Sequence, residues 1–128
     1  MRKPLKVGQN TTFMHKLVIL LGRIAQTHKF QRRWPEFLEQ AEALPGLQSE
    51  ATTRVQEFLY GRRDIHIIHE LFFESQQDLQ DALDSPQGQA AGEILHQITA
   101  GQLNLLTAEH KEDTIEHLRD KQDQYVDE

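Results

Sequence analysis

The sequence predicts a single α+β domain with the element order β-α-β-β-α-β, a four-stranded antiparallel sheet and both helices on one face of the sheet. Three observations support this fold class. The segments 13–23 and 65–74 are apolar on both alternating sets of residues, which is typical of central strands. Segments between the strands place apolar residues three and four positions apart, as amphipathic helices do. The length of 128 residues suits one domain.

The first half of the chain is predicted to form a strand, a helix and a second strand. Residues 28–44 form the helix, with Thr27 as a plausible N-cap. Pro35 either kinks this helix or opens its main part after a short turn. Pro45-Gly46 ends it, and residues 47–60 alternate loosely, as expected of a more polar strand near a sheet edge.

The second half repeats the pattern after a hairpin turn at 61–64. The strand 65–74 leads to a short helix that starts near Ser75, and Ser85-Pro86 opens a longer helix that ends at Gly101. Residues 102–109 form the last strand. From Lys111 onward, an amphipathic C-terminal helix is expected from the spacing of Ile115, Leu118 and Tyr125 or Val126.

Composition and charge exclude several classes of function. The absence of cysteine rules out disulfides, thiolate metal sites and a thiol nucleophile. The longest apolar run is too short to cross a bilayer, and polar residues 8–12 separate the basic N-terminus from it, so neither membrane insertion nor a signal peptide is expected and the location is taken as cytoplasmic. Residues 109–128 hold eight acids and three bases, a charge of −5 out of the total of −6, which disfavours nucleic-acid binding.

The two central strands also predict a homodimer. Two helices on one face leave the other face of the sheet uncovered, and strands 13–23 and 65–74 would expose apolar side chains there. A second copy packed sheet to sheet about a two-fold axis is the simplest way to cover that surface.

Several short motifs then suggest a family. The chain resembles the EthD-like family of the dimeric α+β barrel superfamily, which has a ferredoxin-like βαββαβ fold. The resemblance covers about residues 14–110 and divides the chain into an N-terminal extension (1–12), the domain (13–110) and an acidic tail (111–128). The residues that carry it are the strand from Lys16 to Leu21, Phe30 with Trp34, Leu44 to Leu47, Phe73-Glu74-Ser75 with Leu79, Ser85 to Ala90, and Thr107 to His110.

The resemblance implies a small apolar pocket between sheet and helices that binds an apolar or aromatic molecule. It implies cofactor-independent oxidoreductase or monooxygenase chemistry, with a non-catalytic ligand-binding or structural dimer, an isomerase or cyclase, and a haem-binding relative as alternatives. Two positions depart from the pattern: Leu38 stands where a histidine often follows the helix tryptophan, and Gly88 stands near the Ser-Pro helix start where cyclases carry one. No Gly-rich phosphate loop occurs, so no nucleotide cofactor is expected.

Three histidines are candidate catalytic residues: His15, His66 and His69. His66 and His69 are three apart on one predicted strand, so they point to opposite faces and cannot share a metal ion. The residue on the helix side could pair with His15 and act as a general base; the alternative is a hydrogen-bonded structural histidine. Glu70 is expected either to act as an acid with a raised pKa or to pair with Arg54 or Arg23.

The candidate ligand-binding residues are aromatic. Phe30, Trp34 and Phe37 share one helix face and could form a pocket wall, although a plain core stripe is the alternative. Tyr60, at a predicted strand end, could hydrogen-bond a ligand or be a half-buried hairpin residue. No metal is expected, because His110 and His117 lie about 10 Å apart on a straight helix.

Overall fold

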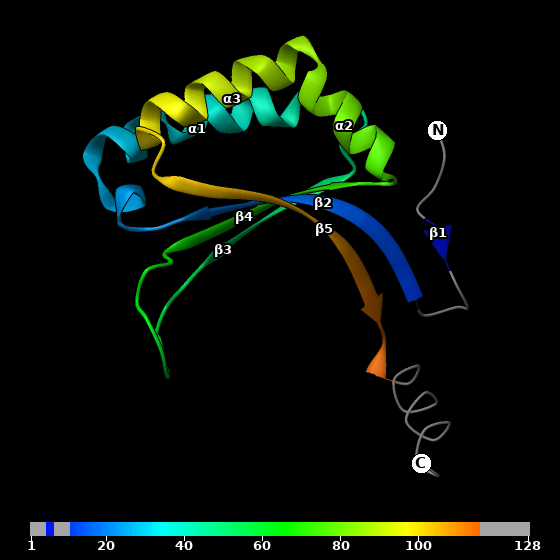
Figure 1. The fold of residues 1–128 in the computed structure, drawn as a ribbon, viewed down its shortest axis with the longest axis horizontal. Helices are drawn as coiled ribbons and strands as arrows, with labels where there is room; N and C mark the ends of the chain where they lie inside the picture. The colour runs from blue at the N-terminus through cyan, green and yellow to red at the C-terminus, as the bar shows by residue number, and fades with distance from the viewer. Residues whose placement is uncertain (1–4, 7–10, 116–128) are drawn as a thin grey trace.

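The computed structural model describes residues 5–6 and 11–115, and these form one sheet with its long helices on a single side. Figure 1 shows the sheet arched, with α1, α2 and α3 on its convex side. The elements are β1 (Leu5–Lys6), β2 (Thr11–Leu21), the 3-10 turn η1 (Arg23–Gln26), α1 (His28–Glu42), β3 (Ser49–Arg54), β4 (Ile67–Phe73), α2 (Gln76–Asp84), α3 (Pro86–Thr99) and β5 (Leu103–Asp113).

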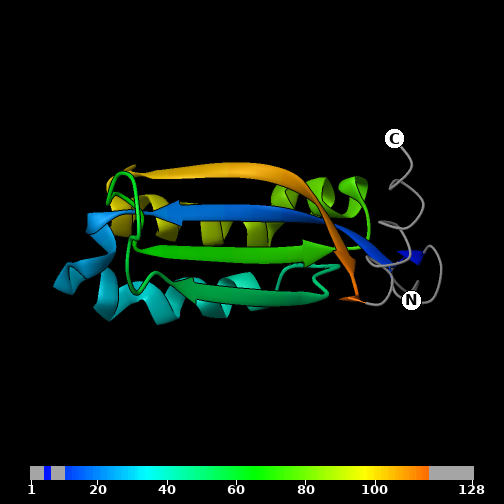
Figure 2. The ribbon, with the colours of Figure 1, turned by 90° about the horizontal axis from the view of Figure 1, so that it is seen from below.

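The four main strands lie in the order β5-β2-β4-β3, and every neighbouring pair is antiparallel (Figure 2). β1 is a two-residue strand that pairs with the start of β2. β2 and β4 are therefore the central strands, as their apolar character on both faces predicts. The predicted α+β fold with a βαββαβ order is confirmed.

Helix α1 begins where the sequence indicates. The Thr27 hydroxyl accepts a hydrogen bond from the Phe30 amide at 3.3 Å, which caps the first turn. Pro35 lies inside the helix and exposed, so it does not open the helix; it only leaves the Gln31 carbonyl without its usual helical partner. The buried residues Phe30, Trp34, Phe37 and Ala41 form the stripe that packs on the sheet.

Ser85 joins α2 to α3 by serving both helices. Its hydroxyl donates to the Ala82 carbonyl at 2.6 Å and accepts from the Gly88 amide at 3.0 Å. A Cβ at Gly88 would lie 2.2 Å from the Ala82 carbonyl oxygen, so the two helices approach closely only because residue 88 is glycine.

The boundaries of β3 and β4 differ from the prediction. The strand expected over 47–60 is limited to Ser49–Arg54, because the last backbone contact with the neighbouring strand is Val55 N–H to the His66 carbonyl, at 3.0 Å. Beyond it, the chain forms a loop in which Leu59 and Tyr60 are about nine-tenths exposed. For the same reason the next strand starts at Ile67 rather than residue 65.

The last strand is longer than predicted. β5 pairs with all of β2, from Leu103 opposite Leu21 to Asp113 opposite Thr11. Lys111 to Asp113 are therefore in a strand, and the expected C-terminal helix does not begin at Lys111. The rest of that helix, including Leu118 and Tyr125, falls outside the described residues. β2 begins at Thr11 and β5 ends at Asp113, so the paired strands extend beyond residues 13 and 110, the expected limits of the domain.

The concave face of the sheet carries no helix of the described part (Figures 1 and 2). Its centre is formed by Val18, Phe72 and a Lys16–Glu70 ion pair, with the Lys16 ammonium 5.5 Å from the centre of the Phe72 ring. Glu70 thus pairs with Lys16 across β2 and β4, and not with Arg54 or Arg23 as expected. Leu106 is 41 % exposed on the same face.

Candidate functional site

The convex face, between sheet and helices, holds most of the predicted site residues. The β-strand register separates them into two groups at opposite ends of this face. His15 lies opposite Phe73, whereas His69 lies opposite Ile19, four residues further along β2. Four residues of strand span about 13 Å. The structure therefore does not bring His15 and His69 together as a pair. His66, which directly precedes β4, lies still further from His15.

His69 is buried among aromatic rings and hydrogen bonds. It is 1 % exposed and meets the edges of Trp34 and Phe37, at centroid distances of 5.3 and 6.2 Å. Its Nδ1 is 2.7 Å from the Thr52 hydroxyl and its Nε2 is 3.2 Å from a Glu50 carboxyl oxygen. Both ring nitrogens are thus occupied, so His69 holds its neighbours in place rather than facing an open cavity.

The pKa values of two groups in this network, Glu50 and His69, are shifted from their ordinary values. Burial raises the pKa of Glu50 to about 7, with further contributions from a hydrogen bond and the negative charge of Glu42. Burial lowers the pKa of His69, an effect that the charges of Glu42 and Glu70 partly oppose. Near neutral pH, Glu50 therefore retains its proton for part of the time, while burial favours the neutral form of the His69 imidazole.

The aromatic stripe of α1 forms one side of a cavity at the β3 edge of the sheet. Phe30, Trp34 and Phe37 stack in sequence at centroid distances of 4.9 Å. The cavity holds about 180 Å³ and is lined by Ala25, Phe30, Gln31, Trp34, Arg54 and Ile67. We refer to it as the Trp34 pocket. A cavity of roughly 150 Å³ can hold benzene, so the volume is enough for one aromatic ring; unlike such an enclosed cavity, this pocket opens to solvent and has a polar rim formed by Gln31 and Arg54.

The Trp34 indole is held rigidly at this pocket. Phe30 and Phe37 stack on it, and the edge of the His69 ring contacts it from the sheet. A second cavity that Phe37 lines, between α1, α3 and the sheet, is entirely apolar but holds only about 70 Å³. Of the two cavities that the aromatic side chains of α1 line, the Trp34 pocket is the one with room for a ring.

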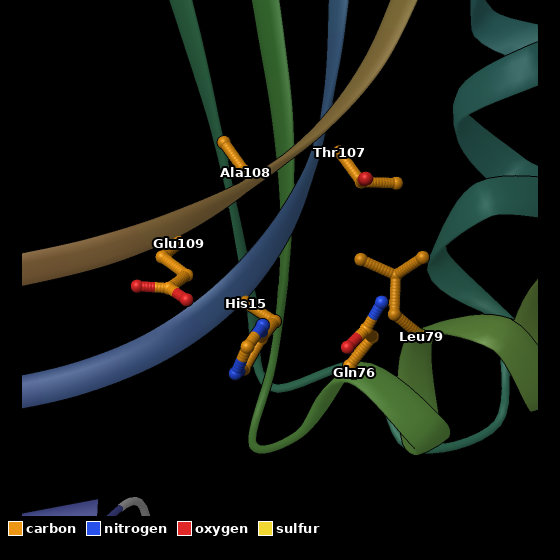
Figure 3. A pocket seen from close by; sticks show the side chains of 6 residues that line it. All are labelled: His15, Gln76, Leu79, Thr107, Ala108 and Glu109. Atoms are coloured by element: carbon orange, nitrogen blue, oxygen red, sulfur yellow. The ribbon is translucent and has the colours of Figure 1, made fainter.

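His15 lies at the opposite end of the convex face, in a polar cavity of about 150 Å³. This His15 pocket is lined by His15, Gln76, Leu79, Thr107, Ala108 and Glu109. Glu109 is directly opposite His15 on β5, so their Cβ atoms are about 5 Å apart. Figure 3 shows the imidazole between Glu109 and Gln76. Within the described part of the chain, His15, Gln76 and Glu109 make no side-chain hydrogen bond with one another or with other residues.

His66 and Tyr60 lie away from both pockets. His66 is half-buried, with Nδ1 3.2 Å from the Gln26 amide, and lines a groove beside the 55–66 loop. Tyr60 is 89 % exposed and lines none of the cavities described above. Sequence reasoning missed Arg54, Glu50 and Glu109, because only the register of the strands places them beside Trp34, His69 and His15.

The described residues hold neither a metal-binding cluster nor a membrane-spanning helix. Across residues 5–6 and 11–115, no cluster of three or more histidine, aspartate or glutamate side chains could hold a metal ion. No helix in the same part of the chain is both long and apolar enough to cross a membrane.

Comparison with known proteins finds similar folds among solved structures. No protein-family model matches the chain, and no curated protein does. Solved structures do match. An EthD family protein of Bacillus halodurans superposes with a TM-score of 0.69 at 21 % identity, over 76 % of this chain and 98 % of that one. A dimeric ferredoxin-like protein of unknown function from Jannaschia gives 0.58 at 18 % identity, covering 75 % and 97 %.

A third match, from Caulobacter crescentus, is described as a candidate antibiotic biosynthesis monooxygenase; its TM-score is 0.50 at 14 % identity, over 80 % and 90 % of the two chains. The chain therefore has the fold of the dimeric ferredoxin-like proteins, the dimeric α+β barrel class. An EthD family protein is among the structures that share this fold, in keeping with the motifs in the sequence.

Proposed function

We propose that this chain is an EthD-like homodimer that binds a small apolar or aromatic molecule in the Trp34 pocket. The observation that carries the proposal is a single-ring-sized cavity whose aromatic wall is fixed in place before any ligand binds. A rigid wall favours binding because no side chain has to be ordered when the ligand enters.

The homodimer is supported by the uncovered concave face. That face holds Val18, Phe72 and the half-exposed Leu106, and the Jannaschia protein of the same fold is dimeric. Val18 and Phe72 are already 8 % and 9 % exposed in the single chain, so the main apolar gain from packing two copies sheet to sheet is the burial of Leu106. Light scattering is expected to give about twice the chain mass of 14.9 kDa, and a mass of 14.9 kDa at micromolar concentration would contradict the dimer.

Fluorescence provides the test of the ligand pocket, because Trp34 is the single tryptophan of the chain. Neutral one-ring aromatics such as benzyl alcohol and benzamide are expected to change its emission with dissociation constants of about 1 mM or tighter. Ala25→Leu extends a side chain into the pocket and is expected to abolish the change.

Thr107→Ile is the matched control, since it adds bulk to the His15 pocket and leaves the Trp34 pocket open. Equal responses from both variants, or no response from the wild-type protein, would exclude the Trp34 pocket as the binding site. Denaturation curves of both variants show whether either substitution has disturbed the fold.

A second function is favoured by the His15 pocket: proton transfer to and from a small carbonyl compound. The imidazole is a suitable general base near neutral pH, and the Glu109 carboxylate opposite can stabilise the imidazolium that forms. Gln76 and Thr107 can donate hydrogen bonds to the substrate oxygen as it gains charge. Cofactor-independent oxidation, with dioxygen as the electron acceptor, would begin with the same removal of a proton from the substrate, so both activities depend on His15.

Exchange of the α-protons of cyclohexanone in D₂O, followed by NMR, tests this second function. His15→Gln is expected to lower the protein-dependent exchange rate about 100-fold or more, since a positioned general base contributes about 100- to 10,000-fold. His66→Gln is the control, since His66 is a half-buried histidine outside this pocket. Equal rates in all three proteins would eliminate His15 as the base.

A further inference from the structure

Arg54 supplies the one full charge among the six side chains that line the Trp34 pocket. The other five are Ala25, Phe30, Gln31, Trp34 and Ile67, which are apolar except for the Gln31 amide. Arg54 lies at the end of β3, opposite Ile67, on the same face of the sheet as Thr52 and His69. The register therefore directs the arginine to the helix side of the sheet, where the aromatic wall stands.

The Arg54 guanidinium has no acidic partner within the described part of the chain. The described ion pairs of the other arginines are Arg33 with Glu36 and Arg62 with Asp64, and none of the residues around the Trp34 pocket is acidic. A guanidinium carries five N–H donors in a planar fork that matches the two oxygens of a carboxylate. Its hydrogen-bonding capacity toward an anion is therefore unused here.

Size limits the ligand as strongly as charge. About 180 Å³ accommodates one six-membered ring with a small substituent, and a fused polycyclic molecule would not fit. Phe30 and Trp34 form the buried end of the pocket, while Arg54 is exposed at the rim. An aromatic ring inside and an anionic group at the rim would satisfy both ends at once.

We infer that the ligand of the Trp34 pocket is a one-ring aromatic carboxylate, with its ring against Trp34 and its carboxylate paired with Arg54. This inference rests on the pocket proposed above and adds the charge of the ligand. It separates this chain's ligand class from neutral aromatic compounds, which carry no negative charge for the guanidinium to pair with.

The experiment compares benzoate with benzamide, which have nearly the same shape but differ in charge. Each is titrated into the wild-type protein and followed by Trp34 fluorescence and calorimetry. Benzoate is expected to bind about tenfold or more tightly than benzamide, with an affinity that falls as salt is added. Arg54→Met, which keeps most of the side-chain length, is expected to remove this preference and leave benzamide binding unchanged.

Arg62→Met is the matched control, because Arg62 is an exposed arginine paired with Asp64 on the 55–66 loop. If benzoate and benzamide bind the wild-type protein equally, or if Arg62→Met weakens benzoate as much as Arg54→Met does, the inference is overturned while the pocket stands. If neither compound binds, the proposed pocket fails along with it. The wild-type comparison gives a result even if Arg54→Met does not fold.

Discussion

His69 illustrates how a buried polar residue can serve a site without reaching a ligand. Its ring nitrogens bind Thr52 and Glu50, and its ring edge supports the Trp34 indole. A buried imidazole without those partners would cost roughly 1–3 kcal/mol. The network therefore keeps Trp34 in one position, while burial, helped by Glu42, raises the pKa of the neighbouring Glu50 carboxyl.

This network predicts how stability depends on pH. The pKa of Glu50 is about 7 in the folded protein and near its ordinary 4.5 when unfolded, so its stabilising proton is fully present below pH 4.5 and is lost as pH rises through 7. His69 acts in the opposite direction: its lowered pKa removes stability as pH falls below its ordinary 6.5.

Glu50→Gln isolates the contribution of the carboxyl group. Between pH 5 and pH 7.5, the wild-type free energy of unfolding is expected to fall by about 1 kcal/mol relative to the variant, a value reduced for the partial exposure of Glu50. Urea denaturation at the two pH values measures the difference. Parallel stability curves for the two proteins would show that Glu50 titrates normally.

At the scale of secondary structure, two glycines of α3 differ in the space available for a side chain. A Cβ at Gly88 would meet the Ala82 and Leu83 carbonyl oxygens at 2.2 and 2.6 Å, whereas a Cβ at Gly92 would meet nothing within 4 Å. Gly88 is therefore required by the packing of α3 on the end of α2. Gly92 only lowers the helical propensity of its own segment.

The two substitutions are expected to change stability in opposite directions. Gly88→Ala should destabilise the protein by about 1–3 kcal/mol, because backbone atoms of α2 must move aside. Gly92→Ala should stabilise it by about 0.5–1 kcal/mol through its better helix propensity. Thermal unfolding of the pair measures both effects, and a loss of stability in both variants would mean that α3 tolerates no side chain at either position.

For the whole molecule, the concave face combines apolar side chains with one ion pair. Lys16 and Glu70 each retain 17 % of their side-chain exposure in the single chain, and both flank Phe72. Opposite charges side by side are self-complementary under a two-fold axis, because a lysine of one copy can face a glutamate of the other. The pair therefore suits a face that binds a second copy of itself.

Charge reversal on this face tests the dimer. Lys16→Glu places two carboxylates side by side and is expected to shift the protein from about twice 14.9 kDa toward 14.9 kDa in light scattering. Lys16→Glu with Glu70→Lys restores an ion pair and should restore the dimer. Lys29→Glu, on an exposed position of α1, makes the same charge change away from this face and should have no effect. A Lys16→Glu protein that stays dimeric would show that the copies meet elsewhere.

The pattern of apolar residues alone determined the number, type and order of the main elements. Thr27, Ser75 and Ser85 marked the helix starts at the positions where their hydroxyls cap backbone amides. These features depend on residues close in the chain, so periodicity and capping chemistry reveal them. The length of β5 and the early end of β3 depend on which strand each one pairs with, and local sequence carries little information about that.

In the candidate site, too, some features follow from local sequence and others only from strand pairing. The sequence indicated Trp34, Phe30 and the three histidines as residues with useful chemistry. Only the tertiary structure decided that His15 faces Glu109, that His69 faces Thr52, and that Arg54 reaches the aromatic pocket. The physical reason is that a shift of one residue in strand register moves every side chain to the other face, so partners across a sheet are set by the folded pairing and not by spacing along the chain.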